Sequence, residues 1–176
     1  METASFAVIG STYFGKAQNF VTAGLNELYQ EHSATVFKTA LRVTGNAADA
    51  EDVLQTVFLR ILDHQLVLNP VLSPEHYLRR AATNASIDLL RRKAARPETE
   101  FEDRLRYDSK ENTLLLKERL RRALAKQPPE NAELFVMCYL EGYSYAELAE
   151  QYQLEPGTVA SRLHRIRAAI KKDLGE

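Results

Sequence analysis

The sequence has very little cysteine and no strong excess of charge of either sign. Its 176 residues include a single cysteine, Cys138, which excludes an intramolecular disulfide framework and a cysteine-rich zinc site. Because Cys138 lies in an apolar run, we expect a buried thiol. The formal net charge is −1, which argues against a protein that coats nucleic acid indiscriminately. The uneven placement of the charges is therefore more informative than their sum.

Long apolar runs are also missing. No stretch is long and apolar enough to span a membrane, and the N-terminus lacks a basic segment followed by an apolar core. We therefore expect neither direct membrane insertion nor a signal peptide, and a cytoplasmic protein is the default.

The chain lacks the motifs of common catalytic sites. The four histidines show no HExxH or other metal-binding spacing, and there is no glycine-rich phosphate loop or nucleophile motif. The sequence therefore predicts no enzyme, no catalytic residue, no cofactor, no metal site and no small-molecule substrate. Almost no segment alternates with period two, so we expect an all-α fold.

The most informative stretch runs from Tyr143 to Leu174 and predicts two helices joined by a tight turn. Ser144 and Glu147 have the spacing of a capping box, and Pro156 suits the first position of the second helix. That second helix repeats apolar residues at helical spacing, which predicts one buried stripe. The stripe contains Val159, Leu163, Ile166, Ile170 and Leu174.

The remaining faces of this second helix are polar and basic, as a helix-turn-helix that enters the major groove requires. Arginine can read guanine edges and can also bind phosphates. An ordinary helical hairpin with a solvated basic face is the alternative interpretation of the pattern. The candidate DNA-facing residues are Thr158, Ser161, Arg162, His164 and Arg165, with Arg167, Lys171 and Lys172 farther along.

The pattern divides the chain into two small helical domains. Residues 1–20 are expected to form a loosely ordered extension, with a short strand or turn at most. Residues 21–96 form the first predicted domain, with a helix over about 22–44 that Gly45 ends and another that Asn46 caps. Residues 97–113 are rich in acids and poor in apolar residues, so we interpret them as a flexible linker. Residues 114–176 form the second domain, with the helix-turn-helix at about 144–172.

The third predicted helix, which starts at Ser73 and Pro74, is strongly basic. Asp88 is its only acid between Leu78 and Arg96, and Asn84 lies among its exposed positions. A basic helix that carries asparagine is compatible with nucleic-acid binding and with a solvated surface alike.

Three sequence blocks, in this order, resemble the extracytoplasmic-function sigma factors of bacterial RNA polymerase. DAEDVLQTVFLRIL at 49–62 resembles the polymerase-binding helix of that family, and YLRRAATNASIDLLRRKA at 77–94 resembles its promoter-melting helix. YSYAELAEQYQLEPGTVASRLHRIRAAIKK at 143–172 resembles its reader of the upstream promoter element. The resemblance covers about Leu25 to Leu174.

The resemblance implies a role for individual residues. It places Asp49, Asp52, Gln55 and Phe58 on a surface that docks on core polymerase. It places Asn84 in the pocket for a base flipped out of the minus-ten element. The full set that it assigns to minus-ten DNA is Tyr77, Arg80, Asn84, Asp88, Arg91 and Arg92. It assigns to minus-thirty-five DNA the set already named on the last helix, namely Thr158, Ser161, Arg162, His164 and Arg165.

The chain departs from the family pattern at three places. Tyr77 stands where many members have tryptophan, and Ala160 occupies a position that is often basic. The apolar segment from His64 to Ser73 lacks the usual Phe-basic-Gly pattern.

The resemblance implies a promoter-specificity subunit whose partners are core RNA polymerase, promoter DNA and an anti-sigma protein. A stand-alone helix-turn-helix regulator is the alternative function, and it predicts specific DNA binding without polymerase.

Overall fold

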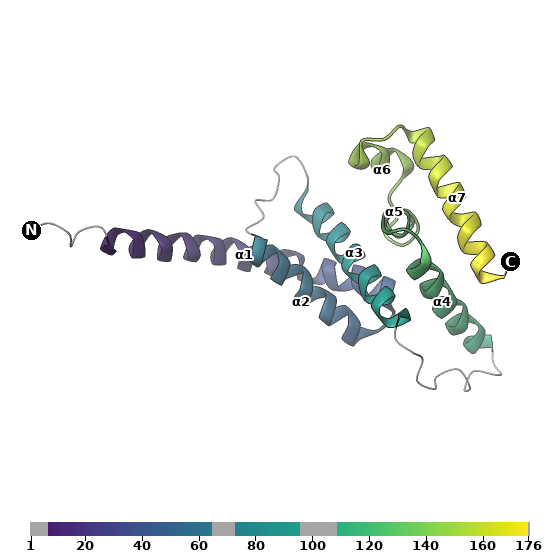
Figure 1. Ribbon diagram of the computed structural model, residues 1–176, viewed down its shortest axis with the longest axis horizontal. Coiled ribbons are helices and arrows are strands. Elements are labelled where there is room, and N and C mark those ends of the chain that lie inside the picture. Colours follow the sequence, from purple (N-terminus) through teal and green to yellow (C-terminus); the bar gives the residue numbers. More distant parts are fainter. Residues whose placement is uncertain (1–6, 65–72, 96–108, 176) are drawn as a thin grey trace, which may run out of the picture.

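The computed structural model describes residues 7–64, 73–95 and 109–175, and every element in these ranges is a helix (Figure 1). The helices are α1 (Ala7–Thr44), α2 (Ala47–His64), α3 (Pro74–Ala94), α4 (Ser109–Lys126), α5 (Pro129–Tyr139), α6 (Tyr145–Tyr152) and α7 (Pro156–Leu174). The predicted all-α class is therefore confirmed.

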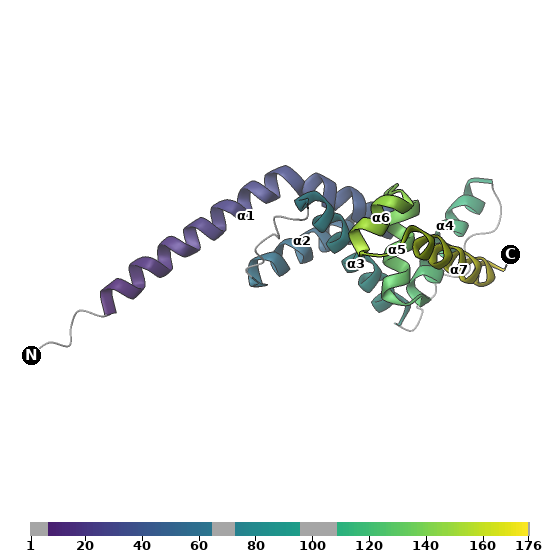
Figure 2. The same ribbon diagram turned by 90° about the horizontal axis from the view of Figure 1, so that it is seen from above.

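Helices α1, α2 and α3 pack around one apolar core. The second half of α1 lies against both other helices, while its first half projects away from the rest of the molecule (Figure 2). The core contains Val36, Ala40, Ala50, Val53, Val57, Phe58, Ile61, Leu78, Ala82, Ala85 and Leu89.

Helices α4 to α7 form a second core, and three residues of the first three helices reach into it. Val43 at the end of α1 and Ile87 and Leu90 of α3 are buried in the same cluster as Leu124, Met137 and the apolar stripe of α7. Helix α3 accordingly packs against α4 and α5 (Figure 1). The two helical domains are thus held together by an apolar contact.

Local sequence signals mark the helix ends as expected. Gly45 follows α1 with φ +69°, a conformation in which a side chain would be strained. The Asn46 side chain accepts from the Asp49 amide at 3.2 Å, which caps α2. Pro156 occupies the first turn of α7.

Two helices begin earlier than the sequence pattern predicts. Helix α1 begins at Ala7 rather than near Thr22, so the extension expected to be loosely ordered is helical from Ala7 onward. No proline lies between Ala7 and Thr44, and glycine in a helix interior costs only about 1 kcal/mol relative to alanine. Helix α4 begins at Ser109 rather than Leu114, so residues 109–113 of the predicted linker are helical. Residues 97–108 of that linker and most of the His64–Ser73 segment lie outside the described residues.

Candidate nucleic-acid interface

Helices α6 and α7 form the predicted helix-turn-helix. The Ser144 hydroxyl accepts from the Glu147 amide, and the Glu147 carboxylate accepts from the Ser144 amide at 2.8 Å, so the predicted capping box is present. Gln153 ends α6 in the left-handed region with φ 53°, which turns the chain toward α7. Leu148 and Ala149 of α6 are buried against the stripe of α7.

Helix α7 buries its apolar stripe and exposes the polar face opposite. Val159, Leu163, Ile166 and Ile170 are buried. The Ser161 hydroxyl donates to the Thr158 carbonyl at 3.0 Å, and Arg165 Nε donates to the Ser161 carbonyl at 3.4 Å. These bonds stay within the helix, so the face remains accessible. All five predicted DNA-facing residues are exposed: Thr158, Ser161, Arg162, His164 and Arg165.

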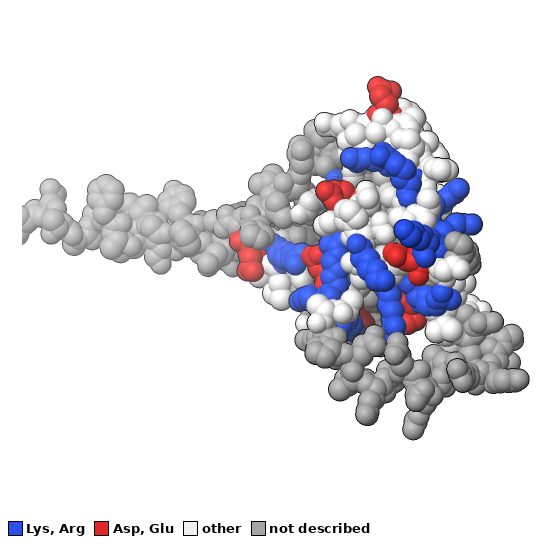
Figure 3. Space-filling model, turned by 45° about the vertical axis from the view of Figure 1, so that its right-hand side comes forward, with Lys and Arg blue, Asp and Glu red and all other residues white. Residues whose placement is uncertain are grey.

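Basic side chains gather on the side of the molecule that includes the C-terminal helices. Figure 3 shows lysine and arginine spread over this face with acidic side chains between them. Lys171 and Lys172 in the last turn of α7 are exposed. Basic side chains close to an exposed polar helix face are what phosphate binding beside a groove requires.

Helix α3 places Asn84, Arg80 and Tyr77 at one hollow. The hollow has a volume of about 330 Å³ and is also lined by Val57, Arg60, Ile61, His76, Ala81 and Gln151. Gln151 comes from α6, so the second domain covers one side of the hollow. Asn84, Arg80 and Tyr77 are all half-buried rather than freely exposed.

The other predicted minus-ten residues of α3 have different surroundings. Arg91 donates to the Ala125 carbonyl at 3.2 Å and to the Gln127 carbonyl at 2.5 Å, both at the end of α4. Asp88 and Arg92 are exposed, and Arg92 Nε donates to the Asp88 carbonyl at 3.4 Å. Arg91 is therefore engaged within the protein, whereas Arg92 faces solvent.

The residues predicted to dock on polymerase divide into two groups. Asp52 and Gln55 are exposed on α2, where they border a second hollow of about 390 Å³ that also contains Leu59, 57% exposed. Asp49 borders the same hollow and pairs with Lys93 at 2.6 Å. Phe58 is instead buried in the core, where its ring lies edge-on against Tyr29 at 4.9 Å between centroids.

Two family models match the chain, Sigma-70 region 2 over residues 28–96 and Sigma-70 region 4 over residues 117–170. The chain is also 32% identical over 166 residues to the ECF RNA polymerase sigma factor SigL of Mycobacterium tuberculosis, with 86% of this chain and 89% of SigL covered. The chain belongs to the ECF sigma factors. The resemblance inferred from three sequence blocks is thus confirmed, and with it the function of a promoter-recognition subunit of RNA polymerase.

Further similarities agree with this family. The sigma factor is 33% identical over 159 residues to SigE of Mycolicibacterium smegmatis, with 86% of this chain covered and 62% of the length of SigE spanned. The structure of CnrH in complex with the cytosolic domain of CnrY shares the fold, with a TM-score of 0.53 at 20% identity over 92% of this chain and 94% of that chain.

The sigma factor carries a carboxylate between its two domains that sequence reasoning did not single out. Glu133 of α5 is buried and accepts from Arg80 Nε at 2.6 Å and from Asn84 Nδ2 at 2.9 Å. It also accepts from the Tyr152 hydroxyl of α6, and the Arg80 guanidinium lies 4.6 Å from the centre of the Tyr152 ring. Burial, then the bond to Glu133, raises the pKa of Tyr152 far above its usual value. The only signal available in the sequence was an acid directly before the apolar run LFVMCY.

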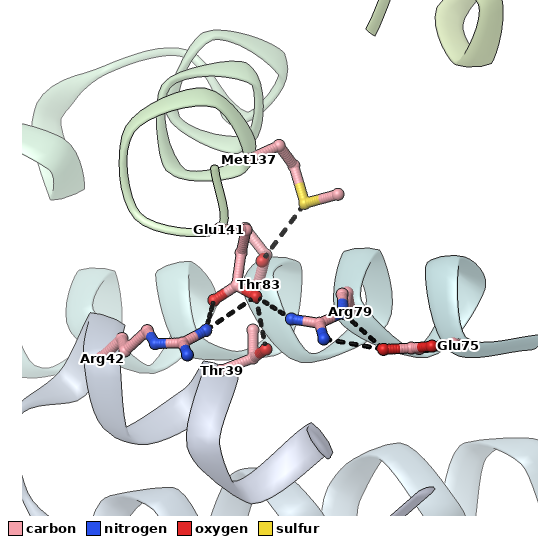
Figure 4. Close-up of polar contacts among 7 residues, drawn as sticks. All are labelled: Thr39, Arg42, Glu75, Arg79, Thr83, Met137 and Glu141. Atoms are coloured by element: carbon pink, nitrogen blue, oxygen red, sulfur yellow. Dashed lines mark hydrogen bonds and ion pairs between the residues drawn. The ribbon is translucent and has the colours of Figure 1, made fainter. Parts of the chain in front are cut away.

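A second carboxylate between the domains, Glu141, lies just after α5. It accepts from Arg42 at 2.9 Å, from Arg79 at 2.5 Å and from the Thr39 hydroxyl at 3.0 Å (Figure 4). Arg79 also binds Glu75 at 2.7 Å, and this bond lowers the pKa of the Glu75 carboxyl. We call Glu141, Arg42, Arg79 and Thr39 the Glu141 cluster.

Across residues 7–64, 73–95 and 109–175, no group of three or more histidine, cysteine, aspartate or glutamate side chains could hold a metal ion. In the same ranges, none of the helices combines the length and apolar character needed to cross a membrane. Cys138 is half-buried rather than fully buried, and burial raises the pKa of its thiol.

Proposed function

We propose that the two domains of this sigma factor divide promoter recognition between them. The second domain binds the minus-thirty-five element through Thr158, Ser161, Arg162, His164 and Arg165. The single observation that carries this assignment is the division of α7, whose apolar stripe is buried while all five of these side chains are exposed. A recognition helix needs that arrangement, because it must be braced from behind and open toward the groove.

The first domain binds the minus-ten element at the hollow on α3. Asn84 offers donors and an acceptor to the edge of an unpaired base, and Arg80 offers a guanidinium to a neighbouring base or phosphate. Tyr77 supplies an aromatic face beside the hollow, on which a base can stack. Capture of an extruded base offsets the few kcal/mol that unstacking costs. Asp88 and Arg92 lie farther along α3 as exposed residues, and Arg92 lines the hollow of α2.

Core polymerase docks on the hollow of α2, where Asp52 and Gln55 surround the exposed Leu59. An exposed leucine with a polar rim is the composition expected of a protein–protein contact. Phe58 supports this surface from the core below it. The sigma factor acts in the cytoplasm as a recognition subunit with no catalytic activity of its own, and an anti-sigma protein is its inhibitory partner.

Transcription by core polymerase from a matched promoter, with and without this chain, tests the proposal. We expect specific initiation only when the chain is present. Asp52→Arg should abolish both initiation and the recovery of core polymerase in a pull-down, because it reverses an exposed charge at the docking hollow. Its circular dichroism should be unchanged, since surface substitutions usually alter stability by about 0.5 kcal/mol or less.

Glu51→Arg is the matched control, since Glu51 is the exposed acid beside Asp52 and does not line the hollow. It should preserve initiation. Specific duplex binding by the free chain, with no effect on initiation by core polymerase, would instead indicate a stand-alone regulator.

A further inference from the structure

Helix α5 and the turn after it bring two buried carboxylates against the basic helix α3. Glu133 has a side chain that is 9% exposed, and the side chain of Glu141 is fully buried. Both belong to the second domain, and their arginine partners all belong to the first. They therefore hold the two domains together, in addition to the apolar contact of Val43, Ile87 and Leu90.

Glu133 occupies the hydrogen-bond donors that minus-ten DNA requires. Its two oxygens accept from Arg80 Nε and Asn84 Nδ2, the residues assigned above to the base pocket. A carboxylate is an anionic acceptor like a phosphate oxygen and satisfies a guanidinium in the same way. The Arg80 Nε–H and the Asn84 Nδ2–H that bind Glu133 cannot bind DNA at the same time. Glu133 is thus positioned as an internal competitor of the promoter strand.

The α3 hollow is also covered from the second domain. Gln151 Nε2 lies 2.9 Å from His76 Nδ1, and the His76 ring packs edge-on against Tyr143 at 4.5 Å. Gln151 lines the hollow together with Asn84 and Arg80. The α6 side of the hollow is therefore closed to a base while α6 packs against α3.

The Glu141 cluster holds this arrangement without touching the hollow. Its members Thr39, Arg42 and Arg79 come from α1 and α3 and converge on one carboxylate (Figure 4). None of the four residues lines the α3 hollow. Loss of the Glu141 charge would leave two arginines facing each other without a shared anion, and breaking a buried pair in this way is strongly unfavourable.

We propose that the free sigma factor is autoinhibited, with Glu133 occupying the minus-ten residues and the Glu141 cluster holding the domains closed. This inference rests on the proposed function of Asn84 and Arg80. It implies that core polymerase must separate α5 from α3 before the minus-ten strand can bind.

The test measures binding of a single-stranded minus-ten oligonucleotide to the full chain without polymerase. The variants are Glu141→Gln and, from the other domain, Arg42→Gln, whose native side chain is half-exposed and less demanding for folding. Glu130→Gln is the matched control, because it removes one exposed charge from α5, the helix that precedes Glu141. Domain separation is followed in parallel by energy transfer between dyes at A48C and D173C, both exposed positions, in a C138S background.

We expect Glu141→Gln and Arg42→Gln to bind the oligonucleotide at least about tenfold more tightly than the parent and Glu130→Gln, since apparent affinity scales with the open fraction. Energy transfer should fall in the same two variants. Unchanged affinity in both variants would overturn the proposal, as would domain separation without a gain in affinity.

The transcription assay distinguishes this failure from failure of the proposed function. If the parent chain directs initiation but neither variant gains affinity for the strand, the proposed function stands and only the autoinhibition is overturned. If the parent chain never directs initiation with core polymerase, the proposed function is overturned, even if both variants gain affinity for the strand.

Discussion

At the scale of single residues, Glu133 is the side chain whose surroundings explain most. A buried carboxylate is stable only when hydrogen-bond donors replace water, and Glu133 has three such donors from α3 and α6. Two of them are side chains assigned to promoter binding. One residue therefore links the stability of the closed protein to the availability of its DNA site.

Asn84→Ala should impair strand opening and leave the fold intact. The substitution removes one hydrogen bond to the buried Glu133 carboxylate, so we expect the free energy of unfolding to fall by about 1–3 kcal/mol while the fold is retained. Binding of core polymerase and of the minus-thirty-five duplex should be retained. Permanganate reactivity of unpaired thymines in the promoter–polymerase complex should fall.

Asn131→Ala of α5 serves as the control for an asparagine that does not line the α3 hollow, and it should open DNA as the parent does. Equal opening and equal base preference in the Asn84 and Asn131 variants would show that Asn84 has no part in strand opening.

Arginines and lysines of α7 should differ in what they contribute. Arg162→Ala or Arg165→Ala should weaken the free energy of binding to the minus-thirty-five element by about 1–3 kcal/mol. Each should also relax the preference at one base position, because these side chains lie where a recognition helix meets base edges. Lys172→Ala should weaken all sequences alike, as loss of a phosphate contact does. Selection from a library of upstream elements measures both effects, and an unchanged preference in both arginine variants would contradict the proposed orientation of α7.

At the scale of elements, arginines from neighbouring helices satisfy the carbonyl ends of several helices. Arg121 Nε donates to the Val43 carbonyl at 3.2 Å, Arg91 donates to the end of α4, and Arg119 donates to the Leu174 carbonyl. The last carbonyls of a helix have no partner within it, and the cationic side chain also suits the negative end of its dipole. These contacts fix α1 to α4, α3 to α4 and α4 to α7.

Gly45→Ala should destabilise the protein more than Gly142→Ala. Both glycines have positive φ, +69° and +81°, so each substitution carries about 1–2 kcal/mol of backbone strain. A Cβ at Gly142 meets nothing within 4 Å, whereas one at Gly45 would lie 1.7 Å from the Arg121 guanidinium. Displacement of Arg121 should add about 1 kcal/mol or more through loss of its charged hydrogen bond. Urea denaturation of the two variants measures the difference, and equal losses would mean that Arg121 adjusts freely.

Element ends were predictable from the sequence because their signals are local. The capping box at Ser144, the glycine after α1 and the proline at the start of α7 each act within a few residues. The early start of α1 was missed because its glycines and scattered aromatics give no periodic pattern. The exposed face of α7 was predictable for the same local reason, since its buried stripe repeats at helical spacing.

The surroundings of the α3 residues were not predictable in this way. Asn84 and Arg80 were identified by their place in a sequence block, but their partner Glu133 lies in another domain, across the predicted linker. Phe58 is a second example, because its position in the sequence block did not reveal that its side chain is buried. Contacts between distant segments depend on packing that no local pattern encodes.

At the scale of the whole molecule, acid should favour separation of the domains. Burial, then the nearby Arg80 and Arg79, lower the pKa of His76; Glu147 of α6 and Glu75 of its own helix act in the opposite direction. The closed state therefore favours neutral His76. The contribution of His76 to the stability of the closed state is complete above about pH 6.5, the usual pKa of histidine, and is lost as pH falls below that value. The lowered pKa values of Glu75 and Glu147 affect stability only below about pH 4.5.

His76→Gln should accordingly remove the fall in stability and in energy transfer between pH 7.5 and 5.5. Thermal unfolding of the parent and the variant across this range provides the measurement, with His164→Gln on the exposed face of α7 as the control. A parent whose stability is constant over the range would contradict the assignment.

The engagement of Arg79, Arg80 and Arg91 by groups of the second domain also has a consequence for counterions. While these guanidiniums bind Glu141, Glu133 and the end of α4, they cannot displace cations from a nucleic-acid backbone. Each phosphate neutralised on a single strand contributes about −0.7 to the slope of log affinity against log salt concentration. If all three arginines become available, the slope for Glu141→Gln should be steeper than that of the parent by about 2. Ionic strength would then discriminate between open and closed forms, because the same DNA would release more ions from one than from the other.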